Sequence, residues 1–321
     1  LENLKVKAPV DGQLGNLEAQ IGQSIAQGER IGQVITPELK VEAKIDEHYV
    51  ERVMPGLPAS FEREGKKYDM EVVEPAVGYL ACGDTGAGKM PDPEVLYEYI
   101  IKEIACEKDL KGKKIMVTAG PTQEAIDPVR YITNHSTGKM GYAIAKRAML
   151  RGADVTLVSG PVALDPVPFV KMVPVTTAQD MFEAVSGGFP EQDILVKAAA
   201  VADYRPSNVS DEKVKKKDGD MAIALERTTD ILGYVGEHKK PEQIICGFSM
   251  ETQNMLENSR KKLKKKHLDM IVANNLKEQG AGFGTDTNRV TIISEKEEKN
   301  LELMSKEEVA DEILNYILEF K

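Results

Sequence analysis

The chain has 321 residues, of which 41% are hydrophobic and 29% are charged, and its formal net charge is −10. This length suits about two domains of a soluble globular protein, the negative charge argues against a general nucleic-acid-binding surface, and no run approaches the ~18 apolar residues of a membrane span. The three cysteines are an odd and scattered number, which favours a reducing cytoplasm over a disulfide framework.

Residues 1–70 are predicted to form a small all-β segment. Val, Ile and Leu alternate there with polar residues, and glycines punctuate the run. "VKAPVDGQLGNLEAQIGQSIAQGERIGQVI" resembles the second half of a lipoyl-like domain in membrane-fusion adaptor proteins of export pumps, and "ELKVEAKIDEHYVERVMPGLPASFE" resembles the barrel that follows it. A small glycine-rich β module without chemistry explains the same pattern, so no activity is assigned to this segment.

The stretch "LACGDTGAGKM" carries Gly83, Gly88 and Lys89 at the spacing of a nucleotide-binding P-loop, G-x-x-x-x-G-K. A P-loop needs a Ser or Thr after the lysine to bind Mg²⁺, and a helix must start there. Met90 follows instead, and the prolines just beyond it predict an extended or turned chain. A phosphate site is therefore expected elsewhere.

The longer stretch "VEPAVGYLACGDTGAGKMPDPEVL" resembles the substrate-recognition clamp of the flavin-dependent phosphopantothenoylcysteine decarboxylases. The resemblance implies that Cys82 matches a cysteine that donates a proton, which a thiol of pKa about 8.5 is able to do. A flavin-binding body should precede this clamp, and residues 1–70 do not resemble one. We therefore expect no FMN, no decarboxylation and an idle Cys82. Residues 93–107 have apolar residues at helical spacing and predict a connector helix, which completes a segment 71–112.

From residue 113 onward, strands and helices alternate. The pattern predicts strands at 113–120, 153–161, 193–204 (running into a loop), 242–251, 270–275 and, at the sheet edge, 289–295, and helices at 136–152, 178–188, 257–269 and 305–320. The first helix has an N-cap candidate at Ser136 or Thr137 and ends at Gly152. Such alternation predicts an α/β, Rossmann-like three-layer domain with a mostly parallel sheet, whose ligands lie beyond the carboxyl ends of the strands.

Three loops or helix starts in this domain carry groups that suit a nucleotide. "HSTGK" offers backbone donors, hydroxyls and a lysine to an anion, although a capped helix with a solvated lysine explains it too. In "KAAAVADYRPSNVSDEKVKKK" the alanines from Ala198 allow a flat base or sugar to approach, Asp203 suits Mg²⁺ or a hydroxyl, and a lysine run begins at Lys213. Lys262 and Lys266 share one helix face, where an anion would offset their repulsion. For the lysine run from Lys213 and for the pair Lys262 and Lys266, the alternative to anion binding is a solvent-exposed charged surface.

Together these stretches resemble one family closely. "VTAGPTQEAIDPVRYITNHSTGKMGYAIA", "AAVADYRP", "EKVKKK", "GFSMET" and "KKLKKKHLDMIVANN" stand in the order and spacing of phosphopantothenate-cysteine ligase, a coenzyme A biosynthesis enzyme, and the resemblance covers residues 113–321. It implies that CTP transfers CMP to the carboxylate of 4′-phosphopantothenate with release of pyrophosphate, and that the amine of cysteine then displaces CMP. It also implies Mg²⁺ and a homodimer. The cysteines predict a cytoplasmic location, and the net charge and the lack of a long apolar run predict no nucleic-acid or membrane partner.

The same resemblance assigns site residues. Asn134 matches the asparagine that holds the acyl-cytidylate, and Lys213 matches the lysine that supports activation. Arg130 is the candidate for the substrate phosphate, which a guanidinium binds bidentately, and we expect it to serve the neighbouring subunit's site. The family's nucleotide positions fall on Lys197, Ala198, Ala199, Asp203, Lys213, Phe248, Lys262 and Lys266. Base and ribose are expected along the alanines and Phe248, the phosphates on the lysines, and Mg²⁺ on Asp203.

Two alternatives come from other classes of protein. The strand–helix–strand unit also suits an NAD(P)-dependent reductase, but no Tyr-x-x-x-Lys pair follows a plausible catalytic serine and the glycine fingerprint is absent. The adaptor-like start suits a non-enzymatic scaffold, against which the missing export signal and anchor argue. Pyrophosphate release that requires both CTP and phosphopantothenate separates the ligase from both. The preference for CTP over ATP rests on the resemblance alone.

Overall fold

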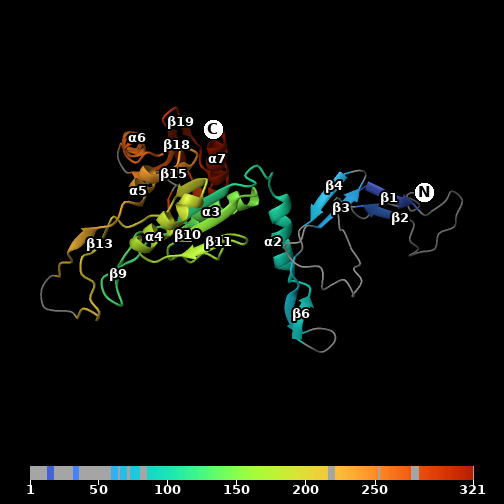
Figure 1. Cartoon of the computed structure of the whole chain (residues 1–321), viewed down its shortest axis with the longest axis horizontal. Helices are drawn as coiled ribbons and strands as arrows, with labels where there is room; N and C mark the ends of the chain where they lie inside the picture. The colour runs from blue at the N-terminus through green and yellow to red at the C-terminus, as the bar shows by residue number, and fades with distance from the viewer. Residues whose placement is uncertain are drawn as a thin grey trace, which may run out of the picture. The chain divides into compact units, whose positions relative to one another are not determined.

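The computed structural model describes residues 13–17, 32–35, 59–63, 66–70, 73–79, 85–215, 221–251, 254–275 and 282–320. The chain divides into two compact units, Leu1–Met90 and Pro91–Lys321 (Figure 1). Cys82 and most of the segment that resembles adaptor proteins lie outside the described residues. Within the described ranges, no helix combines the length and the apolar character needed to cross a membrane. The boundaries at residues 70 and 112 between the three segments that the sequence suggests stay a prediction.

The first unit contains antiparallel strand pairs, which agrees with the all-β prediction for the start of the chain. The pairs are β1 (Gln13–Leu17) with β2 (Gly32–Ile35), β3 (Ala59–Arg63) with β4 (Lys66–Met70), and β5 (Ala76–Tyr79) with β6 (Thr85–Lys89). Lys89 lies in strand β6, and the next helix, α2 (Pro93–Ile104), begins only at Pro93. Lys89 therefore does not stand at a helix start, as a P-loop lysine would.

The second unit is built on an eight-stranded sheet in the order β11-β10-β7-β12-β15-β16-β18-β19. The strands from β11 to β16 run parallel, and β18 and β19 are antiparallel to their neighbours. Their bounds are β7 (Lys114–Ala119), β10 (Asp154–Ser159), β11 (Lys171–Pro174), β12 (Ile194–Lys197), β15 (Ile244–Glu251), β16 (Met270–Asn275), β18 (Val290–Ser294) and β19 (Glu298–Asn300). The chain adds strands on one side of β7 and then returns to its other side, so a topological switch point lies between β7 and β12.

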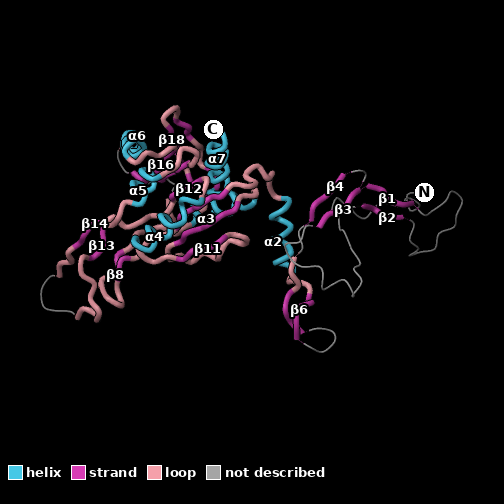
Figure 2. The backbone as a smooth tube through the Cα atoms, in the orientation of Figure 1, coloured by secondary structure: helices cyan, strands magenta, loops and turns pink. Residues whose placement is uncertain are grey.

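Helices cover both faces of this sheet, as Figures 1 and 2 show. On one face, α3 (Lys139–Leu150) and α7 (Lys306–Glu319) share a hydrophobic core with Ile115 and Val117 of β7. On the other face, Met116 of β7 belongs to a second core with three helices, α4 (Ala178–Gly188), α5 (Ile231–His238) and α6 (Met255–Lys265). Successive side chains of β7 thus enter opposite cores, because strand side chains alternate. The predicted three-layer α/β fold is confirmed.

Smaller elements extend from this body. The short 3₁₀ helix η2 (Phe189–Glu191) follows α4, and β17 (Thr287–Asn288) pairs with β20 (Met304–Ser305) before α7. We call two further antiparallel pairs, with the described residues of their connections, the arm: β8 (Glu124–Ala125) with β9 (Tyr131–Ile132), and β13 (Tyr204–Pro206) with β14 (Leu225–Arg227). Figures 1 and 2 together show the strands of the arm at one end of this unit, away from α7. Alternation in the sequence did not indicate these short pairs.

Two local predictions were wrong. The N-cap of α3 is Gly138, in a left-handed conformation with φ 79°, rather than Ser136 or Thr137. Thr137 instead donates its hydroxyl to the carbonyl of Phe283, and a Cβ on Gly138 would come within 2.8 Å of Val162, so glycine is needed there. The strand at 289–295 was predicted at the sheet edge, but β19 pairs along its outer side and leaves β18 buried.

Gly236 of α5 gives a first test of the packing. A Cβ at this position would lie 1.9 Å from the backbone oxygen of Lys266, so Gly236→Ala must push α5 and α6 apart. We expect a loss of about 2–3 kcal/mol in the free energy of unfolding, measured by urea denaturation. Gly187 of α4 is the matched control, because a Cβ there meets nothing within 4 Å and alanine should stabilise the helix by about 0.5–1 kcal/mol. Equal effects at both positions would contradict the packing described here.

Candidate functional site

A pocket of about 600 Å³ opens where the parallel strands end, at the switch point between β7 and β12. Its walls come from the start of α3, the loop after β12, the residues before and at the start of α5, the strand β15, the helix α6 and the segment 282–288. A concave site of this volume is typical of small-molecule binding. The fold therefore places the pocket at the edge of the sheet that the sequence predicted.

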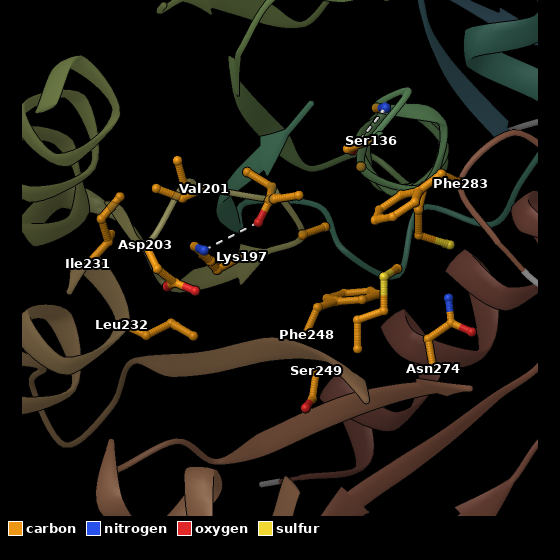
Figure 3. A pocket seen from close by; sticks show the side chains of 18 of the residues that line it. Ser136, Lys197, Val201, Asp203, Ile231, Leu232, Phe248, Ser249, Asn274 and Phe283 are labelled. Atoms are coloured by element: carbon orange, nitrogen blue, oxygen red, sulfur yellow. Dashed lines mark hydrogen bonds between the residues drawn. The ribbon is translucent and has the colours of Figure 1, made fainter. Parts of the chain in front are cut away.

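Most of the predicted nucleotide residues line this pocket. They are Lys197, Ala198, Ala199, Asp203, Phe248, Lys262 and Lys266. Figure 3 shows Lys197 and Asp203 on one side of the cavity, beside Ile231 and Leu232, with Phe248 between them and Phe283. Residues from three separate stretches of sequence thus meet at one cavity.

One side of the pocket is charged, and we call Lys197, Asp203, Asp230, Lys262 and Lys266 the charged end. Lys266 Nζ lies 2.8 Å from Asp230 Oδ1, and that carboxylate also caps α5 by accepting from the N–H of Gly233 at 3.1 Å. Three lysines face two aspartates here. This excess of positive charge suits a polyanionic ligand.

The backbone fixes two of these lysines. Lys262 Nζ donates to the carbonyl of Phe248 at 3.0 Å, and Lys197 Nζ donates to the carbonyl of Ala199 at 3.2 Å. The bond to Ala199 leaves further N–H groups on the Lys197 ammonium, because a lysine has three donors. Both lysines are therefore held in place beside the cavity, and Lys197 keeps donors for a ligand.

Burial, and then the neighbouring ammonium groups of Lys262 and Lys266, lower the pKa of Lys197 to about 8. As the pH rises from 7 to 9, Lys197 therefore loses its proton in the free protein, and an anion bound there loses an ion-pair partner. We expect the Kd of a nucleoside triphosphate to rise by up to about tenfold over this range, measured by calorimetry. In Lys197→Met this pH dependence should disappear, and a dependence that persisted unchanged would show that another group is responsible.

Asn134 joins two walls of the pocket. Its Nδ2 donates to the carbonyl of Ala200, and its Oδ1 accepts from the N–H of Ser136 at 2.9 Å. Ala200 and Ser136 both line the cavity. Because an amide nitrogen carries two hydrogens, one N–H of Asn134 remains for a ligand. Asn134 thus stands directly behind the pocket rather than in its lining.

Arg130 and Lys213 lie together on the arm and do not line the pocket of their own chain. Buried Asp127 connects them: its carboxylate accepts from Arg130 Nε at 3.0 Å and from the N–H of Val214 at 3.1 Å. The Arg130 side chain, followed by backbone N–H groups, holds the pKa of Asp127 well below its usual range despite burial. Arg130 Nη2 also donates to the carbonyl of Val214 at 2.9 Å, so only Nη1 is left for a phosphate.

The uncharged residues Met250, Asn274, Phe283 and Asn288 also line the pocket, and we call them the neutral end. Lys139 and Lys306 line the cavity as well. Figure 3 shows Asn274 and Phe283 on the side away from Lys197 and Asp203. None of the residues of the neutral end was predicted from the sequence. Asn274 ends a strand that was predicted, so its position after a buried run was the available signal, whereas nothing local distinguishes Phe283.

The matching family model is the DNA/pantothenate metabolism flavoprotein C-terminal domain, over residues 110–320. The coenzyme A biosynthesis bifunctional protein CoaBC of Bacillus subtilis (strain 168) is 51% identical over 249 residues, which are 76% of this chain and 61% of that protein. The chain thus spans about 61% of the length of this curated relative. These matches give no support to the resemblance of residues 1–70 to adaptor proteins.

Solved structures share the fold. The crystal structure of the C-terminal domain of CoaBC matches with 48% identity and a TM-score of 0.56, covering 65% of this chain and 95% of that one. A Cab2 variant in complex with phosphopantothenate-cysteine matches with 17% identity and a TM-score of 0.56, covering 72% of this chain and 95% of that one. At 17% identity the second match shows the fold alone.

Proposed function

Because this chain belongs to the DNA/pantothenate metabolism flavoprotein C-terminal domain family, we propose that it is a ligase that joins 4′-phosphopantothenate to cysteine at the expense of CTP, in the cytoplasm. One observation carries the proposal. The residues that match the ligase's nucleotide positions, apart from Lys213, come from three stretches of sequence and line one pocket at the switch point of the sheet. The CoaBC relatives are named for coenzyme A biosynthesis, which agrees with this activity.

The proposed reaction has two steps, because a carboxylate is a poor acyl electrophile. In the first, a carboxylate oxygen of phosphopantothenate attacks the α-phosphorus of CTP, and the bond to pyrophosphate breaks. In the second, the amine of cysteine attacks the acyl carbon, the bond to CMP breaks with its electron pair on the phosphate, and the amine proton goes to solvent. Each step builds negative charge that fixed donors can stabilise.

Donors for both steps surround the pocket. The free N–H of Asn134 is proposed to bind the acyl-cytidylate, and the charged end is proposed to hold the nucleotide. Lys213 is proposed to support activation, and Arg130 to bind the substrate phosphate through its remaining Nη1 donors. Because Arg130 and Lys213 lie on the arm, we propose that they complete the pocket of a partner subunit.

Mg²⁺ is proposed to accompany the triphosphate. In the described part of the chain no cluster of three His, Cys, Asp or Glu residues suits a metal. Asp203 faces the pocket and forms no salt bridge among the described residues, whereas Asp230 is paired with Lys266. A single carboxylate completed by phosphate oxygens is a typical Mg²⁺ environment, and the ion would neutralise part of the triphosphate charge.

The proposed homodimer gives a prediction on the arm. Val129, Tyr131, Tyr204 and Val209 are 47–60% exposed there, an apolar surface that a second copy would cover. We expect Val209→Glu to convert the dimer to a monomer in sedimentation velocity and to lower ligation more than about tenfold, since a buried unpaired charge is costly at an interface. Val95→Glu on α2, also at an exposed valine, is the control and should leave both unchanged. An active monomer would refute the shared site.

The function is tested by following pyrophosphate with the purified chain, Mg²⁺, CTP and phosphopantothenate. We expect release only when both substrates are present, and phosphopantothenoylcysteine only when cysteine is added. Release without phosphopantothenate, or NADPH oxidation without nucleotide hydrolysis, would contradict the ligase. Replacing CTP by ATP in the same assay determines the nucleotide preference.

A further inference from the structure

One buried polar atom in the pocket wall lacks a partner. Asn274 is 4% exposed, and its Oδ1 accepts no hydrogen bond. An unpaired buried acceptor is costly, so native proteins nearly always satisfy such groups. Because Asn274 lines the pocket at the end of β16, a ligand bearing an N–H or O–H group can supply the missing donor.

Ser259 provides an internal comparison. Its Oγ is the other buried side-chain polar atom without a partner among the described residues, and Ser259 is fully buried in α6. Ser259 does not line the pocket, so no ligand there can satisfy it. The two residues share an unpaired oxygen and differ in access to the cavity, which makes Ser259 a matched control for Asn274.

The wall beside Asn274 is held rigidly. Lys306, which is 6% exposed, donates to the carbonyls of Gly282 at 3.1 Å and Thr287 at 3.3 Å and also to that of Thr285. Lys139 donates to the carbonyl of Gly284 at 3.0 Å, and Thr137 to that of Phe283. These contacts fix the backbone of the segment 282–287, whose Phe283 side chain faces the cavity (Figure 3). A recognition group fixed in this way loses little entropy when a ligand binds.

The charges at the neutral end suit an amine better than a phosphate. The two lysines nearest to it are already engaged: Lys306 with backbone carbonyls, and Lys139 with Asp286 at 2.7 Å. A phosphate would find more ammonium groups at the charged end, where three lysines line the cavity. What the neutral end offers is an acceptor, Asn274 Oδ1, next to the apolar side chains of Phe283 and Met250.

We propose that the neutral end is the amino-acid subsite, in which Asn274 Oδ1 accepts a hydrogen bond from the attacking amine and Phe283 and Met250 pack against a thiol-bearing side chain. The inference rests on the proposed ligase function. A neutral amide oxygen binds one N–H of the amine without stabilising its protonated form as a carboxylate would, so the nitrogen lone pair stays available to the acyl carbon. Sulfur against an aromatic edge and a thioether is a favourable contact.

The experiment separates the two half-reactions in the full chain. Pyrophosphate release is measured with CTP and phosphopantothenate alone, and the KM for cysteine is measured in the complete reaction. In Asn274→Ala we expect the KM for cysteine to rise about 2- to 10-fold, as for one lost hydrogen bond between neutral groups, with pyrophosphate release unchanged. Ser259→Ala should change neither. Asn274→Asp should lower kcat for amide formation with pyrophosphate release intact, because its carboxylate would hold the amine in its protonated form.

Phe283→Leu gives an independent readout in case Asn274→Ala does not fold. It should reduce the preference for cysteine over serine while leaving pyrophosphate release intact. An unchanged KM for cysteine in Asn274→Ala, an equal loss of pyrophosphate release, or an unchanged cysteine preference in Phe283→Leu would each overturn the subsite. If the native chain released no pyrophosphate, the ligase function itself would fail, and the subsite with it.

Discussion

Lys213→Gln should lower pyrophosphate release from CTP and phosphopantothenate by about 10²–10³-fold, the usual consequence of removing one donor that stabilises charge in the transition state. Lys213 is exposed on the arm, so its loss should cost little stability. The neighbouring Val214 is bonded to Asp127, which brings the lysine to the same region as Arg130. Single-turnover measurement of pyrophosphate isolates this step from the later attack by cysteine.

Lys111 is a suitable control for this substitution. It is exposed on the loop after α2 and outside both the arm and the pocket, so Lys111→Gln removes the same charge at a position without a proposed role. We expect it to leave pyrophosphate release unchanged. If Lys111→Gln and Lys213→Gln reduced the rate equally, the effect would come from net charge, and the proposed role of Lys213 would be wrong.

Asn134→Asp should lower formation of phosphopantothenoylcysteine by a similar factor, about 10²–10³. The aspartate loses both N–H donors, so a carboxylate oxygen faces the carbonyl of Ala200 where a hydrogen bond exists now. The loop after β12 must then shift, and the acyl-cytidylate loses its proposed amide donor. We expect the intermediate to hydrolyse rather than accumulate, which CMP release without amide formation would reveal.

Asn300→Asp adds the same negative charge on β19, far along the sheet order from β7 and β12. Its Oδ1 accepts from Thr291 at 2.7 Å, and aspartate preserves that bond. Ligation should therefore stay at the native rate in this variant. Normal ligation by Asn134→Asp itself would show that neither the bond to Ala200 nor the free N–H of the amide is needed for the reaction.

Local pattern was enough to predict most of the α/β body, although not α5 or β11, and the edge of the sheet at which the pocket opens. Strands such as β7 are short apolar runs, and helices such as α7 follow a spacing of three and four residues, so near neighbours in sequence decide both. Polar residues in the loops that follow buried parallel strands, such as Asp203 after β12, must gather at one edge. Asp203, Lys262 and Lys266 of the charged end could therefore be predicted from local pattern. Lys197 was assigned by the resemblance, and Asp230 was not predicted.

The features of the fold and of the pocket that could not be predicted depend on contacts between residues far apart in the chain, which no local spacing encodes. Asp127 connects Arg130 to Val214, Thr137 gives its hydroxyl to Phe283 instead of capping α3, and β19 covers a strand that was expected at the edge. The unpaired oxygen of Asn274 is visible only once all its neighbours are placed, because an unsatisfied group is a property of its whole surroundings. Tertiary structure therefore decided how the arm is held together and what the neutral end of the pocket offers to a ligand.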